Sequence, residues 1–380
     1  MNLSVMPNAT TEFWMRNETL PISDPNHNQA TIPISLPKSQ LYSSRNILII
    51  LMYMILFFVA GIGNLTVFIS LFRSRHRKSR ISLMIRHLAV ADLIVTFVMI
   101  PIEVCWRLTG RWLAGNVACK MVQFVRALGP YLSSNVLVCI SLDRYFAVMH
   151  PLQVNAARKR GKMMLMVAWG ASLTYCVPQC FVFHLRSHPL NPDYKQCVTF
   201  GSFPNEFLEL IYNLSCLVFL YFIPLTVIIV SYSCILAEIS KTSKAHRVNN
   251  SKESIKNSSN KLRLRRSDTK TIERARSRTL RMTVIIVVIY ILCCTPYTVM
   301  TLWYMFDRTT AEQSLPVLVQ DFFFMMVISN SCMNPIVYGS FVIDFKKFSC
   351  QCSECGEKTS TDSMIPLNSG MVKKIPNIPI

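Results

Sequence analysis

The sequence predicts an all-α membrane protein, built as a bundle of seven membrane-spanning helices followed by a short amphipathic eighth helix. Composition is the first observation behind this prediction. Of the 380 residues, 51% are hydrophobic and only 16% are charged, whereas charged residues make up about a quarter of an ordinary soluble domain. The second observation is that the apolar residues are gathered into long blocks, and the third is the distribution of Lys and Arg between those blocks.

Seven segments are long and apolar enough to cross a membrane. A helix needs about 20 residues to cross about 30 Å of hydrocarbon. Five segments exceed that length without any charged residue: 47–72, 163–185, 210–237, 282–306 and 322–343. Two more, 82–106 and 116–149, contain a few charged residues, and we count them as spans too. Because seven is an odd number, we expect the two termini on opposite sides of the membrane.

The positive charges predict the orientation, because Lys and Arg in short loops are retained on the cytoplasmic side. With the N-terminus outside, 30 of the 40 Lys and Arg residues lie inside. We therefore predict a multi-pass protein of the plasma membrane, with an extracellular tail over 1–45, a membrane domain over 46–345 and a cytoplasmic tail over 346–380. The basic inner loop at 239–275, rich in Ser and Thr, is expected to be disordered. The net charge of +20 then indicates contact with anionic lipid or an acidic partner, and not with nucleic acid.

Both predicted tails carry candidate modification sites. In the outer tail, three asparagines begin sequons for N-glycosylation: Asn2, Asn8 and Asn17. Just past the last span, three cysteines are candidates for palmitoylation: Cys350, Cys352 and Cys355. They follow the amphipathic segment 345–348, which we expect to lie on the inner leaflet as the eighth helix. Metal binding is the alternative for this cysteine cluster, and the lack of a neighbouring His disfavours it.

Four other cysteines fall near the outer face, where disulfides form. They are Cys105, Cys119, Cys180 and Cys197, and they allow three pairings. We favour Cys119 with Cys197, because one lies at the outer end of the third span and the other in the long outer loop that follows the fourth. The alternative is that all four are small apolar fillers.

Asp92 lies in the middle of the second span, where a charged side chain costs several kcal/mol and is a functional candidate by default. Polar residues at similar depth are expected around it: Asn64, Ser133, Asn330, Ser331 and Asn334. Oxygen ligands at this density could hold a water cluster or a monovalent cation such as sodium. The alternative is a hydrogen-bonded cluster that only fastens the helices together.

Arg126 lies about 10 Å into the membrane from the outer end of the third span, so we expect it to face a cavity and not lipid. Glu103 on the second span falls at a comparable height, and the two could pair. Further candidates would line a mostly apolar pocket around them: Arg107, Gln123, Tyr297, Trp303, Tyr304, Gln320 and Phe324. The alternative for the aromatic members is ordinary packing, or a place in the aromatic belt at the membrane interface.

Several short motifs, one or more in each span, together resemble the signature of rhodopsin-like G-protein-coupled receptors. The matching residues are Asn64 in Gly-Asn-Leu, Asp92 in Leu-Ala-Val-Ala-Asp, Cys119, Asp143-Arg144-Tyr145, Trp169, Pro224, Tyr232, Cys293-Cys-Thr-Pro296 and Asn334-Pro335-Ile-Val-Tyr338. The resemblance implies that the sixth span, 282–306, swings about Pro296, that Arg144 leaves Asp143, and that Tyr232 and Tyr338 help to stabilise the open form. The G-protein α-subunit would then enter the inner end of the bundle, with arrestin and receptor kinases as further partners.

Within this class, the segments 124–148 and 329–339 are most similar to receptors of the adipokinetic hormone, corazonin and gonadotropin-releasing hormone group. The resemblance implies an extracellular, short, amidated peptide ligand and signalling through Gq or Gs proteins. Our main interpretation is an adipokinetic-hormone-like peptide. The alternatives are a corazonin-, gonadotropin-releasing-hormone- or vasopressin-like peptide. In this group the positions of Arg126 and Glu103 are implied to contact the ligand.

Two residues depart from the pattern of the class. In the sixth span, the Cys-Trp-x-Pro motif usual in this class reads Cys293-Cys294-Thr-Pro296. Cys294 therefore stands where an aromatic residue is usual. Arg276 stands where rhodopsin carries an acid, so the salt bridge from that acid to Arg144 cannot form. We therefore expect Arg144 to be restrained chiefly by Asp143.

Other function classes find less support in the sequence. A transporter or channel is the more distant alternative, but the chain shows no inverted repeat of interrupted helices and no Gly-rich filter segment. We expect no enzymatic activity, because His-Glu-x-x-His, Gly-x-Ser-x-Gly and P-loop motifs are absent from the sequence.

Overall fold

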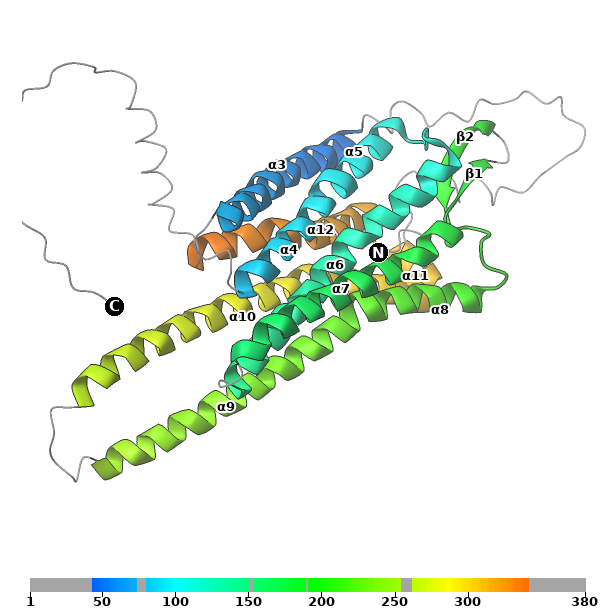
Figure 1. Cartoon of the computed structure of the whole chain (residues 1–380). Coiled ribbons are helices and arrows are strands. Elements are labelled where there is room, and N and C mark those ends of the chain that lie inside the picture. The colour runs from blue at the N-terminus through cyan, green and yellow to red at the C-terminus, as the bar shows by residue number, and fades with distance from the viewer. Residues whose placement is uncertain (1–42, 74–79, 151–153, 189–190, 254–261, 342–380) are drawn as a thin grey trace, which may run out of the picture. The chain divides into compact units, whose positions relative to one another are not determined.

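The computed structural model describes residues 43–73, 80–150, 154–188, 191–253 and 262–341. Over these ranges, seven helical segments are long and apolar enough to cross a membrane (Figure 1). They are Ser44–Arg73, Arg80–Thr109, Gly115–Met149, Ala157–Val182, Glu206–Lys241, Leu280–Phe306 and Val317–Gly339. The predicted seven-helix bundle is thereby confirmed. The predicted glycosylation and palmitoylation sites and the eighth helix lie outside the described residues.

The second and fifth spans are each assembled from two α-helices joined by a π-helix. The elements in chain order are α3 (Ser44–Arg73), α4 (Arg80–Ile94), η1 (Val95–Met99), α5 (Ile100–Thr109), α6 (Gly115–Met149), α7 (Val154–Val182), β1 (His184–His188), β2 (Asn191–Val198), α8 (Glu206–Leu217), η2 (Val218–Phe222), α9 (Ile223–Glu253), α10 (Leu262–Phe306), α11 (Arg308–Ser314) and α12 (Val317–Phe341).

Helix α6 is the central helix of the bundle. Of the most apolar window of its span, 72% is buried inside the protein, compared with 22% for α3. Large apolar side chains on other helices, such as Phe181 and Met166, are exposed on the outside. A bilayer would cover these side chains, and α6 supplies the inner wall against which the other helices place polar residues.

Proline explains a contact between the fifth and sixth spans. Pro224 is the second residue of α9, just after η2, and lacks the N–H that would bond the carbonyl of Leu220 in an α-helix. The hydroxyl of Tyr290, on α10, donates a hydrogen bond of 2.9 Å to this carbonyl oxygen. A backbone group that proline leaves without its usual partner is thus satisfied by a neighbouring helix, which joins the two spans at mid-depth.

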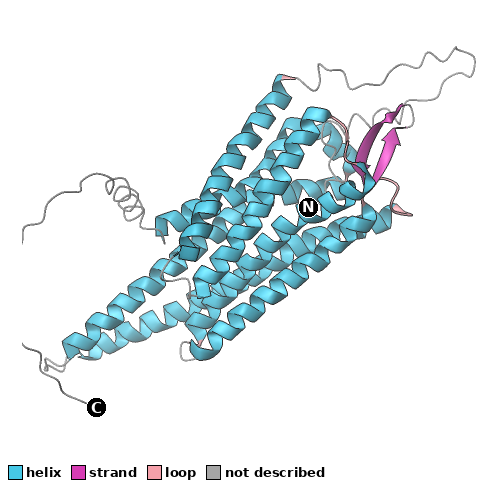
Figure 2. Ribbon diagram, turned by 45° about the horizontal axis from the view of Figure 1, so that its top comes forward, coloured by secondary structure: helices cyan, strands magenta, loops and turns pink. Residues whose placement is uncertain are grey.

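The two strands form an antiparallel hairpin at one end of the bundle (Figure 2). Gly110, which ends α5 with a φ of 64°, presents its carbonyl oxygen to the hairpin. Gln196 Nε2 donates to that oxygen at 2.8 Å and Tyr194 Oη at 2.9 Å. The disulfide between Cys119 and Cys197 ties the same strand to α6, as predicted. Cys105 and Cys180, the other two candidates, are free thiols.

The inner segment 239–275, which the sequence predicted to be disordered, is helical over most of its length. Helix α9 continues to Glu253 and α10 begins at Leu262. The segment contains no Gly or Pro and carries eleven Lys and Arg residues, which favour the helix. Polar composition indicates exposure to water, but it does not by itself prevent a helix that continues from a membrane span. Residues 254–261 lie outside the described residues.

Candidate ligand-binding site

Glu103 on α5 and Arg126 on α6 form an ion pair inside the half of the bundle that carries the hairpin. The two residues are 1% and 2% exposed, so both charges are withdrawn from solvent. The pairing agrees with the similar heights that the sequence predicted for them. A buried ion pair adds little net stability, because the cost of desolvation offsets the attraction. Its retention here is easier to explain by ligand recognition than by folding.

Arg126 has hydrogen-bond donors without partners among the described residues. Its Nε and Nη1 atoms donate no hydrogen bond to any residue in the described ranges. The guanidinium lies over the ring of Phe324, 5.8 Å from the centroid, and that ring is 5.8 Å from the ring of Tyr297. Arg126 therefore sits between a carboxylate and two aromatic rings. Buried donors without partners are costly, so a ligand that supplies oxygen acceptors would be bound favourably.

A second buried ion pair lies nearby and joins Arg107 at the end of α5 to Asp321 on α12. The guanidinium of Arg107 also lies over the ring of Tyr53, 5.6 Å from its centroid. The Oδ2 atom of Asp321 accepts no hydrogen bond within the described part of the chain. Asp321 was not among the site residues that the sequence predicted. The available signal was a single acidic residue directly before the last uncharged stretch, on the outer side where Arg107 needed a partner.

Most of the other predicted ligand residues are buried, and one of them is exposed. Gln123 is buried, with Nε2 3.7 Å from the disulfide sulfur of Cys197. Tyr304 and Gln320 are buried and bonded to each other, Gln320 Nε2 donating to Tyr304 Oη at 2.6 Å. Trp303, by contrast, is 37% exposed, so the structure does not place it with the buried site. On one α-helix, Trp303 and Tyr304 point about 100° apart, so only one of them can face the interior.

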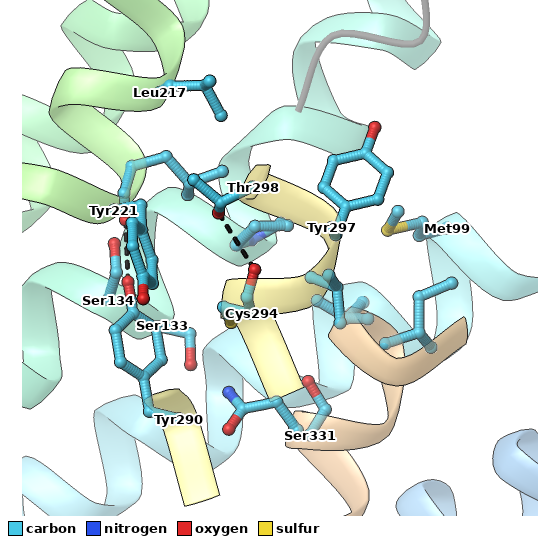
Figure 3. A pocket seen from close by; sticks show the side chains of 16 residues that line it. Met99, Ser133, Ser134, Leu217, Tyr221, Tyr290, Cys294, Tyr297, Thr298 and Ser331 are labelled. Atoms are coloured by element: carbon cyan, nitrogen blue, oxygen red, sulfur yellow. Dashed lines mark hydrogen bonds between the residues drawn. The ribbon is translucent and has the colours of Figure 1, made fainter. Parts of the chain in front are cut away.

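A cavity lined by residues of five spans lies deeper in the bundle (Figure 3). Tyr297, one of the predicted ligand residues, forms part of its wall, while its hydroxyl points away from the space between the labelled side chains (Figure 3). Cys294 lies at the centre of the α10 wall. The sequence singled out Cys294 as a departure from the receptor pattern, but it did not predict a cavity there.

Asp92 is fully buried and collects three hydrogen bonds. Ser133 Oγ and Ser331 Oγ donate to Oδ1 at 3.3 and 3.0 Å, and Asn334 Nδ2 donates to Oδ2 at 2.8 Å. Asn64 reaches the cluster indirectly, through the backbone oxygen of Ser331 at 2.8 Å. Asn330 lines the cavity instead. The predicted polar cluster thus exists, with four of its five expected partners bonded to Asp92 or to each other.

Near the C-terminal end of α6, Asp143 pairs with two arginines. Arg144, its neighbour in sequence, forms the ion pair that the sequence predicted. Arg80, at the start of α4, adds a second at 2.8 Å, which the sequence did not predict. The side chain of Arg276 lies outside the described residues. Asp143 is fully buried, and it links the second span to the third at the cytoplasmic end that the charges predict.

The remaining residues implied to act in activation lie on α6, α9, α10 and α12. Tyr232 on α9 and Tyr338 on α12 are both buried, and Tyr338 Oη has no hydrogen-bond partner within the described ranges. Pro296 lies inside α10 and Pro335 inside α12. Tyr145, next to Arg144, is partly buried.

Comparison with known proteins gives a consistent result. Residues 63–338 match the family model described as 7 transmembrane receptor (rhodopsin family). The chain is 35% identical to the gonadotropin-releasing hormone II receptor of Clarias gariepinus over 324 residues, which cover 85% of this chain and 83% of that protein. It is 34% identical to the gonadotropin-releasing hormone receptor of Octopus vulgaris, over 82% of this chain and 75% of that protein. Identity to the gonadotropin-releasing hormone receptor of Cavia porcellus is 34%, over 69% of this chain and 77% of that protein.

Proposed function

Because the chain belongs to the rhodopsin family of seven-transmembrane receptors, we propose that it is a cell-surface receptor for a short, amidated peptide hormone of the gonadotropin-releasing-hormone-like kind. The names of its relatives favour this alternative over the adipokinetic-hormone-like ligand that was the main interpretation of the sequence. The receptors for these two kinds of peptide belong to one group. The family is one of receptors and not of enzymes, in agreement with the motifs absent from the sequence.

The buried pair of Arg126 and Glu103 is the observation that carries the proposal. An amidated peptide offers backbone carbonyls and a terminal carboxamide but little charge. The spare Nε and Nη1 donors of Arg126 would bond such oxygens. When no ligand is bound, the carboxylate of Glu103 balances the charge of Arg126, so that the guanidinium is not an isolated buried cation.

The bias of Lys and Arg supports an N-terminus outside and a C-terminus inside, an orientation that would present this site to the extracellular medium. The inner end, with Arg144 and Asp143, would then face a heterotrimeric G protein of the Gq or Gs class. A ligand shifts the receptor between closed and open states only by the difference in its affinity for the two. Phosphorylation of Ser and Thr residues in 239–275 by receptor kinases, with arrestin binding, belongs to the same proposal.

An allosteric sodium ion beside Asp92 is a further part of the proposal. Carboxylate, amide and hydroxyl oxygens are the ligands that hard cations prefer. The oxygens Asn64 Oδ1 and Asn334 Oδ1 are buried and accept no hydrogen bond from the described residues. Together with the Asp92 carboxylate and Ser133 Oγ, they make a donor set that fits a monovalent cation.

The test is a screen of synthetic amidated peptides, gonadotropin-releasing-hormone-like and adipokinetic-hormone-like, against cells that express the full chain. We expect a calcium or cyclic-AMP response, and ligand-dependent nucleotide exchange on purified G protein. Substrate or ion flux in vesicles, without any effect on nucleotide exchange, would instead establish the transporter or channel alternative.

A further inference from the structure

The first turns of α7 carry a dense group of positive charges. Arg158, Lys159, Arg160 and Lys162 are basic residues that follow one another closely, and α7 contains no Asp or Glu that could balance them. The ion pairs found in the described ranges all involve other residues. Because the N-terminal end of a helix is itself partly positive, these cations repel that end as well as one another. An anion bound beside them would relieve this repulsion.

Three of the four side chains, Arg158, Lys159 and Lys162, are exposed, and we call them the α7 basic cluster. An α-helix turns by about 100° per residue, so the cluster and the exposed Met163 and Met166 fall within an arc of about 140°. The cluster lies in the first turns of the membrane span. One outward face of α7 therefore changes from basic to apolar along the helix, in the same order as a phospholipid changes from head group to acyl chain.

Arg160 faces α6 instead, and α6 and α7 lie side by side (Figure 1). Its guanidinium lies over the ring of Phe146 on α6, 4.0 Å from the centroid. The ring of Phe146 in turn lies 5.3 Å from that of Tyr145 and 6.3 Å from that of His150. Contact between a cation and an aromatic face is favourable. It fixes the basic end of α7 to α6, so the α7 basic cluster is held on a packed helix.

The spacing of the cluster matches several phosphates on one small ring. Arg158 and Lys162 are four residues apart, hence about 6 Å along the helix axis. Two phosphate monoesters together carry about −3 to −4 at pH 7, which balances three cations. A phosphatidylserine head group, with a single net negative charge, would balance only one of them. Basic groups at the cytoplasmic ends of membrane spans are typical binding sites for phosphoinositide head groups.

We propose that the α7 basic cluster binds the head group of an inositol phospholipid with at least two phosphate monoesters on its ring, and that the acyl chains cover Met163 and Met166. A soluble inositol phosphate would leave the two methionines uncovered, so the apolar part of this face favours the lipid. Such lipids belong to the cytoplasmic leaflet, so the role in a cell rests on the orientation given in the proposed function. Binding to the purified protein does not depend on it.

The primary test adds dioctanoyl phosphatidylinositol bisphosphate to the purified full chain in detergent and measures the fraction with bound lipid by native mass spectrometry. Dioctanoyl phosphatidylserine has the same acyl chains, and inositol trisphosphate has the head group without them. We expect the bisphosphate lipid to bind about tenfold more tightly than either. Equal binding of phosphatidylserine would overturn the choice of a phosphoinositide. Equal binding of inositol trisphosphate would overturn the membrane source.

A triple variant locates the binding on α7. It combines Arg158→Gln, Lys159→Gln and Lys162→Gln, and it should lower the affinity for the bisphosphate lipid about a hundredfold, since each basic residue near an anionic lipid contributes about fivefold. The three side chains are exposed and Gln has nearly the helix propensity of Lys and Arg, so this variant should fold. Its Tm without lipid checks that. Should it unfold, the three single variants replace it, and unchanged affinity in all of them contradicts the proposal.

A matched control removes the same number of charges elsewhere, at Arg73, Lys241 and Arg281. These side chains are also exposed and lie at the ends of the first, fifth and sixth spans, on the same side of the membrane as the start of α7. With all three replaced by Gln, the chain should bind the bisphosphate lipid as tightly as the unchanged chain. Equal losses in the two triple variants would show attraction by net charge alone and would overturn the site.

These measurements need neither a peptide nor a G protein. If no peptide activates the receptor, the proposed function fails while the lipid result stands. If a peptide activates the receptor but the triple variant on α7 binds the bisphosphate lipid normally, this inference fails while the proposed function stands.

Discussion

Asp321 on α12 forms a buried ion pair with Arg107 on α5, and this contact joins the seventh span to the second at the outer end of the bundle. Arg107 and Asp321 are 7% and 5% exposed. Neither charge could be left alone at that depth without a large desolvation cost.

Removing one partner of this pair should therefore destabilise the receptor more than removing both. Asp321→Ala leaves a buried guanidinium and is expected to cost about 3–5 kcal/mol. The double variant Arg107→Met with Asp321→Leu should recover most of that loss, because two apolar side chains of similar size fill the space. Thermal unfolding of the purified protein measures the difference. Additive losses in the double variant would show that the two side chains do not act as a pair.

Arg126→Ala should weaken peptide binding by about 2–5 kcal/mol, a loss of roughly 30- to several-thousand-fold in potency. Arg126→Lys should lose less, since it keeps the charge but cannot reproduce the planar array of donors. Cell-surface labelling controls for expression. The double variant Arg126→Gln with Glu103→Gln removes the buried charges together and separates binding from misfolding. Potency unchanged in Arg126→Ala would remove this residue from the site.

Sodium should weaken agonist binding through Asp92. Replacing sodium chloride by N-methyl-D-glucamine chloride at equal ionic strength is expected to raise agonist affinity severalfold, because the ion would stabilise the closed state. Asp92→Asn, which keeps the size and removes the charge, should abolish that dependence. Affinity that responds equally to sodium in both proteins would exclude a cation beside Asp92.

Asp143 is expected to hold Arg144 in the closed state. Asp143→Asn removes both of its ion pairs and should raise ligand-independent nucleotide exchange about 5- to 30-fold, as a loss of 1–2 kcal/mol from the closed state would do. Arg80→Gln removes only the competitor for the carboxylate, so basal exchange should stay level or fall. A rise in basal exchange in Arg80→Gln would show instead that Arg80 itself restrains opening.

The hairpin should loosen in alkali. Burial raises the pKa of Tyr194 from 10.0 to about 12, and its neutral hydroxyl donates to the Gly110 carbonyl. Because the pKa in the folded state lies above the ordinary value, this contribution is complete below pH 10 and is lost as pH rises towards 12. Tyr194→Phe should lower Tm at pH 8 and approach the unchanged protein at pH 11.5. A constant difference in Tm across this range would contradict the assignment.

The features predicted correctly from the sequence are those that depend on the depth of a residue in the membrane. The apolar blocks gave the seven spans, and counting residues along two helices placed Glu103 and Arg126 at one height, where the structure pairs them. Contacts that depend on the rotation of a helix about its own axis were harder to predict. The sequence alone put Trp303 in the site although it is partly exposed, and it gave no partner to Arg80.

The cavity and the inner helices illustrate two further limits. A void arises from the combined shapes of side chains on five spans, so the single departure at Cys294 could mark its place but not its volume. In the segment 239–275, low hydrophobicity was interpreted as disorder, whereas helix propensity and continuity with the spans prevail in the described part.

The hydrogen bond from Tyr290 to the main chain at Leu220 makes two distant positions interdependent. The hydrogen bond itself places no demand on the side chain at 220, since only its carbonyl is used. Substituting Pro224 would restore an amide that can bond the same oxygen, and the phenol would then no longer be needed to satisfy it. Homologues in which another residue replaces Pro224 should therefore tend to have Phe in place of Tyr290, a correlated replacement of residues 66 positions apart.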